Sequence, residues 1–211
     1  MLKLTFYGGA GTVTGSNFLI EGTQSKILID CGMEQGRDFS EERTYAPFPY
    51  DVASIDALVI THAHLDHIGR APKLIREGFK GKVFMTEATR DLTEVMLRDS
   101  VGILGNEAKE RGLVPLYDDN DVTTLLARVT TLEYHQEHEV APGLSVYLRN
   151  TGHILGSASV RVRDVSKGAG SDSVSVAITG DIGNSPSPYL PDWEKVEDAD
   201  AIVMELSLIH I

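Results

Sequence analysis

The sequence predicts an α/β fold in which two β-sheets pack together and helices cover them from outside. Short apolar runs alternate with glycine-rich turns in the N-terminal half of the chain. Two helical stretches follow in the middle, and a second group of apolar runs fills the C-terminal half. Strands that come in groups separated by helices are typical of stacked sheets with helices outside them.

The first group of strands is predicted from short apolar runs that are bounded by turn residues. These runs are Leu2–Tyr7, Asn17–Ile20, Lys26–Ile29, Ala57–Ile60 and Lys82–Met85.

The glycine-rich segment YGGAG at positions 7–11 raises an alternative, because it follows a strand and Asp30 lies about 20 residues further on, as in a dinucleotide-binding unit. Its glycine spacing does not match G-x-G-x-x-G, and the next segment, Ser16–Ile20, has the pattern of a strand and not of a helix. We therefore interpret it as a tight turn between two strands.

Helical spacing predicts three helices. The first covers Ile68–Glu77 and ends at Gly78, and the second runs from Glu87 to about Gly112, with Thr86 as its N-cap. The third covers Asp119–Ala127.

The second group of strands lies after these helices. Ser166–Ser173 is a polar loop that we interpret as a hairpin tip. The strands are Val129–Leu132, Leu144–Leu148, Ser157–Val162, Val174–Ile178 and Ala201–Met204.

The composition limits the function. The chain has 211 residues, 42% of them hydrophobic, and a formal charge of −12, which argues against a wholly basic surface for nucleic acid. Its single cysteine, Cys31, excludes an intramolecular disulfide and favours a cytoplasmic location. We expect no signal peptide, and no apolar run approaches the roughly 20 residues that span a bilayer.

A histidine-rich segment, THAHLDHIG, follows the apolar run Ala57–Ile60. His62 and His64 are two residues apart, so in an extended segment they face the same side. Asp66 and His67 follow where a helix begins, and they point at a neighbouring position. Imidazole and carboxylate together suit zinc or a similar divalent ion. The spacing therefore predicts two adjacent metal positions, against the alternative of a solvated, histidine-rich loop.

The same arrangement recurs at other strand ends, which favours the metal interpretation. An apolar run leads into Asp30, another leads through a short loop to His153, and a third leads through Thr179-Gly180 to Asp181. Loops at the ends of buried strands are common places for binding and catalytic sites.

These motifs carry a family resemblance over residues 1 to about 205. The H-x-H-x-D-H motif with a later histidine and aspartate resembles the metallo-β-lactamase fold of binuclear metallohydrolases. The segments LIDCGMEQG, NTGHILGSASV and ITGDIGN resemble its RNA-processing branch, whose members carry a β-CASP domain. That branch includes the nuclease subunit of the cleavage and polyadenylation specificity factor and its bacterial and archaeal relatives.

The resemblance implies an αββα sandwich and a role for each site residue. His62, His64 and His153 would hold one ion, Asp66 and His67 would hold a second, and Asp181 would bridge them. Asp30 would orient the cluster through hydrogen bonds, and Asp66 would also accept a proton. We expect two divalent ions, with zinc as the expected metal, and a hydroxide between them that attacks a phosphodiester bond of RNA. Relatives often dimerise, so a homodimer is a further expectation.

The resemblance ends after Glu205. Family members continue with Ser-Thr-Tyr-Gly and a β-CASP domain, whereas this chain continues with LSLIHI. We therefore interpret residues 1–205 as the N-terminal part of a metallo-β-lactamase domain, incomplete at its C-terminus, and residues 206–211 as an unrelated tail. The β-CASP domain and the late histidine of the second metal position are expected to be absent, and His210 is a poor substitute. Reduced or absent activity is expected from this chain.

Two other functions compete with an RNA endo- or exonuclease. One is a small-ester or thioester hydrolase of the same fold, but the sequence around His153 lacks the Pro-Gly-His-Thr pattern of those enzymes. The other is a non-catalytic subunit of an RNA-processing complex, which usually loses metal ligands that are retained here.

Four other residues have plainer interpretations. His135 and His138 are placed in a polar turn, Cys31 is expected to be a small buried packing residue, and Trp193 is expected to pack rather than to stack on a base.

Overall fold

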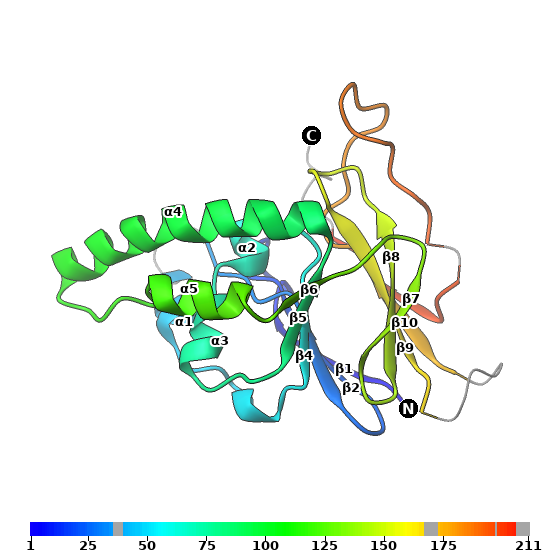
Figure 1. Ribbon diagram of the computed structural model, residues 1–211, viewed down its shortest axis with the longest axis horizontal. Coiled ribbons are helices and arrows are strands. Elements are labelled where there is room, and N and C mark those ends of the chain that lie inside the picture. Colours follow the sequence, from blue (N-terminus) through cyan, green and yellow to red (C-terminus); the bar gives the residue numbers. More distant parts are fainter. Residues whose placement is uncertain (36–39, 167–172, 197, 206–211) are drawn as a thin grey trace.

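Two β-sheets stacked face to face form the centre of the computed structural model, which describes residues 1–35, 40–166, 173–196 and 198–205 (Figure 1). In this part of the chain the first sheet has six strands in the spatial order β1 to β6. The pairs β1–β2 and β2–β3 are antiparallel, and β3 to β6 are parallel. The strands are β1 Lys3–Gly8, β2 Asn17–Glu21, β3 Lys26–Ile29, β4 Ala57–Val59, β5 Lys82–Met85 and β6 Val129–Thr131.

The second sheet has five described strands in the order β11-β10-β9-β8-β7. All neighbours are antiparallel except β10 and β11. β8 and β10 therefore run in the same direction, on either side of β9. The strands are β7 Glu137–Ala141, β8 Leu144–Asn150, β9 Ala158–Asp164, β10 Ser175–Ile178 and β11 Ala201–Val203.

Two hydrophobic layers pack against the two faces of the first sheet. The layer between the sheets joins Ile27, Ile29 and Val59 of the first sheet to residues such as Val146 and Val160 of the second. The other layer lies between the first sheet and the helices. Figure 1 shows the helices together on that side of the first sheet, with the second sheet on its opposite side.

The outer face of the second sheet differs from the predicted αββα sandwich. Within the described ranges, no helix covers this face, and a segment that follows β10 crosses it instead. Glu194 N donates to Asn150 O at the end of β8, and Arg161 of β9 pairs with Asp198. Arg161 and Arg163 are polar residues of β9 that alternate with buried valines. The expected outer helical layer is therefore not found in this part of the chain.

The long helix α4, Glu87–Arg111, has the ends that its sequence predicts. Thr86 Oγ1 accepts a hydrogen bond from Thr89 N at the start, and Gly112 ends the helix with a φ of 66°. That left-handed conformation is easily adopted by glycine. Helix α5, Asp119–Leu126, begins with a capping box formed by Asp118 and Asp121.

The predicted helix Ile68–Glu77 is wrong as a continuous element. The chain forms a short helix α2, Leu65–Ile68, and then a separate helix α3, Ala71–Arg76. Pro72 is the reason, because it has no N–H to donate to the carbonyl of Ile68 and it is tolerated only in the first turn of a helix.

Three elements were not predicted. Helix α1, Ser40–Tyr45, and the 3₁₀ helix η1, Val52–Ser54, are short and lack a clear periodic pattern. Strand β7 carries the polar sequence EHEVA and lies at the edge of its sheet, where pairing with β8 stabilises it. His138 therefore lies in a strand, and only His135, with a φ of 61°, lies in the predicted turn.

Candidate metal centre

The predicted site residues follow strands that run in matching directions in each sheet. Asp30 follows β3, and His62 to His67 follow β4, which is parallel to β3. His153 follows β8, and Asp181 follows β10. The loops after these four strands meet at one end of the sandwich, so the fold brings together residues that are far apart in the sequence.

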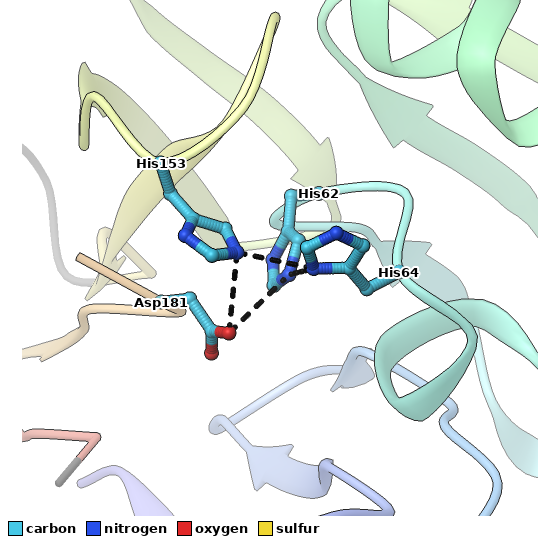
Figure 2. Close-up of side chains that lie close together, drawn as sticks. All are labelled: His62, His64, His153 and Asp181. Atoms are coloured by element: carbon cyan, nitrogen blue, oxygen red, sulfur yellow. Dashed lines mark hydrogen bonds and ion pairs between the residues drawn. The ribbon is translucent and has the colours of Figure 1, made fainter. Parts of the chain in front are cut away.

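Three histidines and one aspartate converge at this end (Figure 2). His64 Nδ1 lies 3.1 Å from His62 Nε2 and 3.0 Å from His153 Nε2. Asp181 Oδ2 lies 3.7 Å from His62 Nε2 and 3.4 Å from His153 Nε2. The four side chains each offer one ligand atom, and these atoms all lie within 4.8 Å of one another.

Hydrogen bonding alone does not account for this cluster. His64 Nδ1 faces two ring nitrogens at about the same distance, and it can share one proton with only one of them. Tetrahedral zinc with Zn–N bonds of about 2.0–2.1 Å places neighbouring ligand atoms about 3.4 Å apart. The four separations given above, 3.0 to 3.7 Å, bracket that value, and all six lie within 4.8 Å. The four residues therefore fit a divalent ion.

A second group of ligand types lies beside the first. His67 Nε2 is 3.8 Å from Asp66 Oδ2 and 3.2 Å from Asp181 Oδ1. Asp181 thus directs its Oδ2 atom to the first histidine group and its Oδ1 atom to His67. A carboxylate shared in this way suits two neighbouring ions.

Asp30 is fully buried behind His67, in a left-handed conformation with a φ of 59°. Its Oδ2 atom lies 2.7 Å from His67 Nδ1, and it also accepts hydrogen bonds from the hydroxyls of Thr61 and Ser16. Its Oδ1 atom accepts from Thr61 N at 2.8 Å. These contacts orient His67 so that Nε2 faces Asp66 and Asp181.

The electrostatics of the histidines differ between the two groups. Burial lowers the pKa of His62 and of His153, so both rings are neutral and able to bind a metal at pH 7. Burial alone would also lower the pKa of His67, but the carboxylates of Asp30 and Asp181 outweigh it and raise this pKa to about 10. The pKa of Asp181 is lowered, because its interactions with His67 and the other histidines outweigh its burial.

A comparison with known families identifies the fold. A family model for the metallo-beta-lactamase superfamily matches residues 10–158. The chain belongs to the metallo-beta-lactamase superfamily. A metallo-beta-lactamase of Cronobacter sakazakii with a HARLDQ motif is 19% identical in sequence, with a TM-score of 0.51 over 84% of this chain and 60% of that one. The predicted fold class is therefore confirmed at the level of the superfamily.

Relatives within the superfamily act on RNA or in transcription, according to their names. Ribonuclease TTHA0252 of Thermus thermophilus is 37% identical over 204 residues, which cover 97% of this chain and 43% of that protein. Transcription termination factor FttA of Methanosarcina mazei is 38% identical over 160 residues, covering 74% of this chain and 24% of that protein. The chain thus spans less than half the length of these relatives.

Membership of the metallo-beta-lactamase superfamily implies divalent metal ions, and the histidine–aspartate cluster is the place that can receive them. The alternative of a solvated loop is wrong, because His62 is fully buried and His67 is nearly so. In the described part of the chain, no helix combines the length and apolar character needed to cross a membrane.

Glycines allow the ligand loops of this metallo-beta-lactamase fold to pack backbone against backbone. A Cβ atom on Gly32 would lie 1.6 Å from Asp66 O, and one on Gly183 would lie 1.9 Å from Gly152 O. Both glycines are next to or near a site residue in the sequence, and that proximity is the signal that identifies them.

Hydroxyl side chains that hold the ligand loops were not predicted. Ser157 Oγ accepts hydrogen bonds from His153 N at 3.1 Å and from Ile154 N at 3.3 Å. Thr86 and Thr89, at the start of α4, donate to the carbonyl of Gly156. Serine and threonine beside the ligands are only a weak signal, because the partner of Thr86 and Thr89 is distant in sequence and the short-range contacts of Ser157 depend on how its loop folds.

The four other residues that the sequence pointed to are not part of the ligand cluster. His135 pairs with Glu194, and His138 lies in β7, so neither joins the cluster. Cys31 is fully buried, as predicted. Trp193 was expected to pack, but 42% of its surface is exposed, and it lines a cavity of about 250 Å³ near Ile202. The predicted tail, with His210, lies outside the described residues, as does most of the predicted hairpin tip.

Proposed function

We propose that this chain carries the metal centre of a hydrolase that cleaves phosphodiester bonds in RNA with two divalent ions, zinc being the expected metal. The observation that carries the proposal is the position of Asp181, whose two carboxylate oxygens face two separate groups of ligands. The relatives named as a ribonuclease and as a transcription termination factor support RNA as the substrate class.

The roles of the residues follow from their contacts. His62, His64 and His153 would hold the first ion, Asp66 and His67 would hold the second, and Asp181 would contact both. When bound, the ions would supply positive charge for the phosphate oxygens and lower the pKa of water. Asp30 keeps His67 in place through the hydrogen bond to Nδ1.

Asp66 is the residue to which we assign proton transfer in addition to metal binding. Its side chain is only partly buried, and its Oδ2 atom lies at the edge of the second group, 3.8 Å from His67 Nε2. A carboxylate in that place can accept a proton from an attacking water molecule and remain hydrogen-bonded to it.

Two divalent ions would also offset the negative charge of the protein near the site. The chain carries a net charge of −12, which repels RNA at long range. Two divalent ions would place four positive charges at the end of the sandwich where the substrate must bind.

A cytoplasmic location and a homodimer remain predictions that accompany this proposal.

The test measures RNA cleavage and thioester hydrolysis by the same protein. The 211-residue chain is stripped with a chelator, reloaded with zinc or manganese, and incubated with an end-labelled single-stranded RNA. Ribonuclease TTHA0252 serves as the positive control, and the Asp66→Asn variant as the negative one. We expect slow cleavage that requires both the metal and Asp66.

Other outcomes contradict the proposal. Hydrolysis of the thioester alone would favour the small-ester hydrolase, and RNA cleavage that persists in Asp66→Asn would point to a contaminating nuclease. A wild-type protein that binds RNA but no divalent ion would favour the non-catalytic subunit.

A further inference from the structure

Thr61 lies between Asp30 and the two buried histidines, and nothing in the sequence singled it out. Its side chain is fully buried at the end of β4. Its Oγ1 atom lies 2.9 Å from Asp30 Oδ2, 3.1 Å from His62 Nδ1 and 3.4 Å from His67 Nδ1. One hydroxyl therefore contacts a histidine from each of the two ligand groups.

The protons in this network can be assigned from the groups that share it. Asp30 already accepts from Ser16 and from Thr61 N, and as a carboxylate it has no proton to give. The single proton of the Thr61 hydroxyl must then point to Asp30, which leaves an oxygen lone pair facing His62 Nδ1. For that contact to be a hydrogen bond, His62 Nδ1 must carry the proton.

This assignment determines which ring nitrogen of His62 is free. With a proton on Nδ1, the Nε2 atom keeps its lone pair, and Nε2 is the atom that faces His64, His153 and Asp181. The opposite tautomer would direct an N–H into the cluster and block metal binding there. His67 is held in the same sense by a shorter contact, the 2.7 Å approach of its Nδ1 atom to Asp30.

The backbone of Thr61 is held independently of its hydroxyl. Thr61 N donates to Asp30 Oδ1 at 2.8 Å, and Thr61 O accepts from Ala158 N at 2.8 Å. The side chain also packs closely against Gly180, where a Cβ atom would lie 2.9 Å from Thr61 Cβ. A substitution that keeps the shape of threonine should therefore leave the loop in place while removing only the hydroxyl.

We propose that Thr61 is a positioning residue, whose hydroxyl connects Asp30 to His62 and keeps His62 Nε2 free for the first metal position. The inference rests on the proposed function in one respect only, namely that the cluster binds divalent ions. In this arrangement the buried carboxylate of Asp30 orients one histidine of each ligand group. It contacts His67 directly, and it acts on His62 through Thr61. Outer contacts of this kind typically change metal affinity by about 10–100-fold when they are removed.

Two variants separate the hydroxyl from the packing of the side chain. Thr61→Val keeps the branched shape and removes the hydroxyl, whereas Thr61→Ser keeps the hydroxyl and removes the methyl group. Zinc affinity is measured by competition with a chelator. The His62 tautomer is read in the metal-free protein from long-range ¹⁵N–¹H couplings by NMR. Thermal unfolding of the metal-free proteins checks that both variants fold.

We expect Thr61→Val to weaken zinc binding at the first position by about 10–100-fold and to lose the preference for a proton on His62 Nδ1. Thr61→Ser should stay close to wild type in both measurements. The proposal is overturned if Thr61→Val keeps the wild-type tautomer and affinity. It is also overturned if Thr61→Ser loses as much as Thr61→Val, since the methyl group would then be the important part.

The design distinguishes this inference from the proposed function. If wild-type protein binds no divalent ion, the proposed function fails, and the NMR measurement on the metal-free protein still decides whether Thr61 sets the tautomer. If wild type binds zinc and cleaves RNA while Thr61→Val behaves like it, only the role of Thr61 is refuted.

Discussion

The carboxylate of Asp30 lies 2.7 Å from Nδ1 of His67, and it is fully buried while it also accepts three hydrogen bonds from Thr61 and Ser16. A buried carboxylate is costly unless donors surround it, and here the donors come from the loop after β4 and from Ser16, between β1 and β2. Asp30 therefore links the stability of this end of the sandwich to the geometry of the metal centre.

Replacing Asp30 by asparagine should affect both properties. The amide nitrogen cannot accept the hydrogen bonds that Oδ2 accepts, so buried donors lose their partner. We expect the metal-free Asp30→Asn protein to lose about 1–3 kcal/mol of unfolding free energy in urea titrations. Metal affinity at the His67 position should fall by about 10–100-fold.

Asp51→Asn is the matched control for that variant. Asp51 is exposed and caps the 3₁₀ helix η1, where asparagine caps equally well, so its unfolding free energy should hardly change. Equal stabilities of Asp30→Asn and Asp51→Asn would contradict the structural role of Asp30.

Asp181 and Asp66 should differ in how many ions they affect. Asp181 directs one oxygen to each ligand group, whereas Asp66 directs its Oδ2 atom toward His67 of the second group. We expect Asp181→Asn to weaken both metal positions and Asp66→Asn to weaken only one. Native mass spectrometry after dialysis against a fixed zinc concentration measures the ions retained per chain. Loss of a single ion in both variants would argue against a shared Asp181.

Metal binding should depend on pH mainly through His67. Asp30 and Asp181 raise its pKa to about 10 against the effect of burial, so its ring is protonated at pH 7 in the metal-free protein. A protonated ring cannot bind an ion, so binding at this position must release that proton. Affinity there should rise by up to about tenfold per pH unit between pH 7 and 9.

Metal binding at the first position, formed by His62, His64 and His153, should depend less on pH. The pKa values of His62 and His153 are lowered by burial, so these rings are neutral at pH 7 and release no proton when Nε2 binds an ion. Calorimetry in two buffers of different ionisation enthalpy counts the released protons. An ion that binds at the His67 position without releasing a proton would refute the assigned electrostatics.

Gly183 should tolerate no side chain. A Cβ atom there would lie 1.9 Å from the carbonyl oxygen of Gly152, so the two loops that carry His153 and Asp181 would have to separate. We expect Gly183→Ala to cost about 1–3 kcal/mol in unfolding free energy and to weaken metal binding.

A glycine on helix α4 provides the comparison. A Cβ atom on Gly102 meets nothing within 4 Å, and alanine favours a helix over glycine by up to about 1 kcal/mol. Gly102→Ala should therefore be neutral or stabilising in the same urea titration. A Gly183→Ala protein as stable as Gly102→Ala would show that the loops are not packed as described.

Cys31 should be unreactive in the folded protein. Burial raises the pKa of its thiol to about 12, so the reactive thiolate is scarce at pH 8. Because it is the only cysteine, mass spectrometry after treatment with iodoacetamide reports on it alone. Labelling should be slow in buffer and fast in denaturant, and rapid labelling of the folded protein would contradict the burial of the loop after β3.

The strands of the core were predictable because burial and local pattern agree. β3, β4 and β5 are short apolar runs buried on both faces, as expected for parallel strands between two hydrophobic layers. β7 was missed because its stability comes from pairing with β8, and its own sequence is mostly polar. The break between α2 and α3 was missed because the apolar spacing continues through Pro72 while the backbone hydrogen bonds do not.

In the candidate site, too, some residues were predictable from the sequence and others were not. The histidines and aspartates were predicted because their residue types bind metals and their positions follow apolar strands. Thr61 and Ser157 were not, because a hydroxyl acquires its role only from partners that the fold places beside it. The outer face of the second sheet was predicted to carry helices, and the described chain places an extended segment with Trp193 there instead.

Zinc titration of the chelator-treated protein tests whether the cluster of three histidines and Asp181 binds a divalent ion. Wild type is compared with His64→Gln, in which the ring nitrogen that faces both His62 and His153 is lost. We expect wild type to bind one zinc ion tightly and His64→Gln to bind it far more weakly, while the unfolding of the metal-free protein is little changed. A folded wild-type protein that binds no zinc, or a His64→Gln variant that binds it equally well, would show that this cluster is not a metal site.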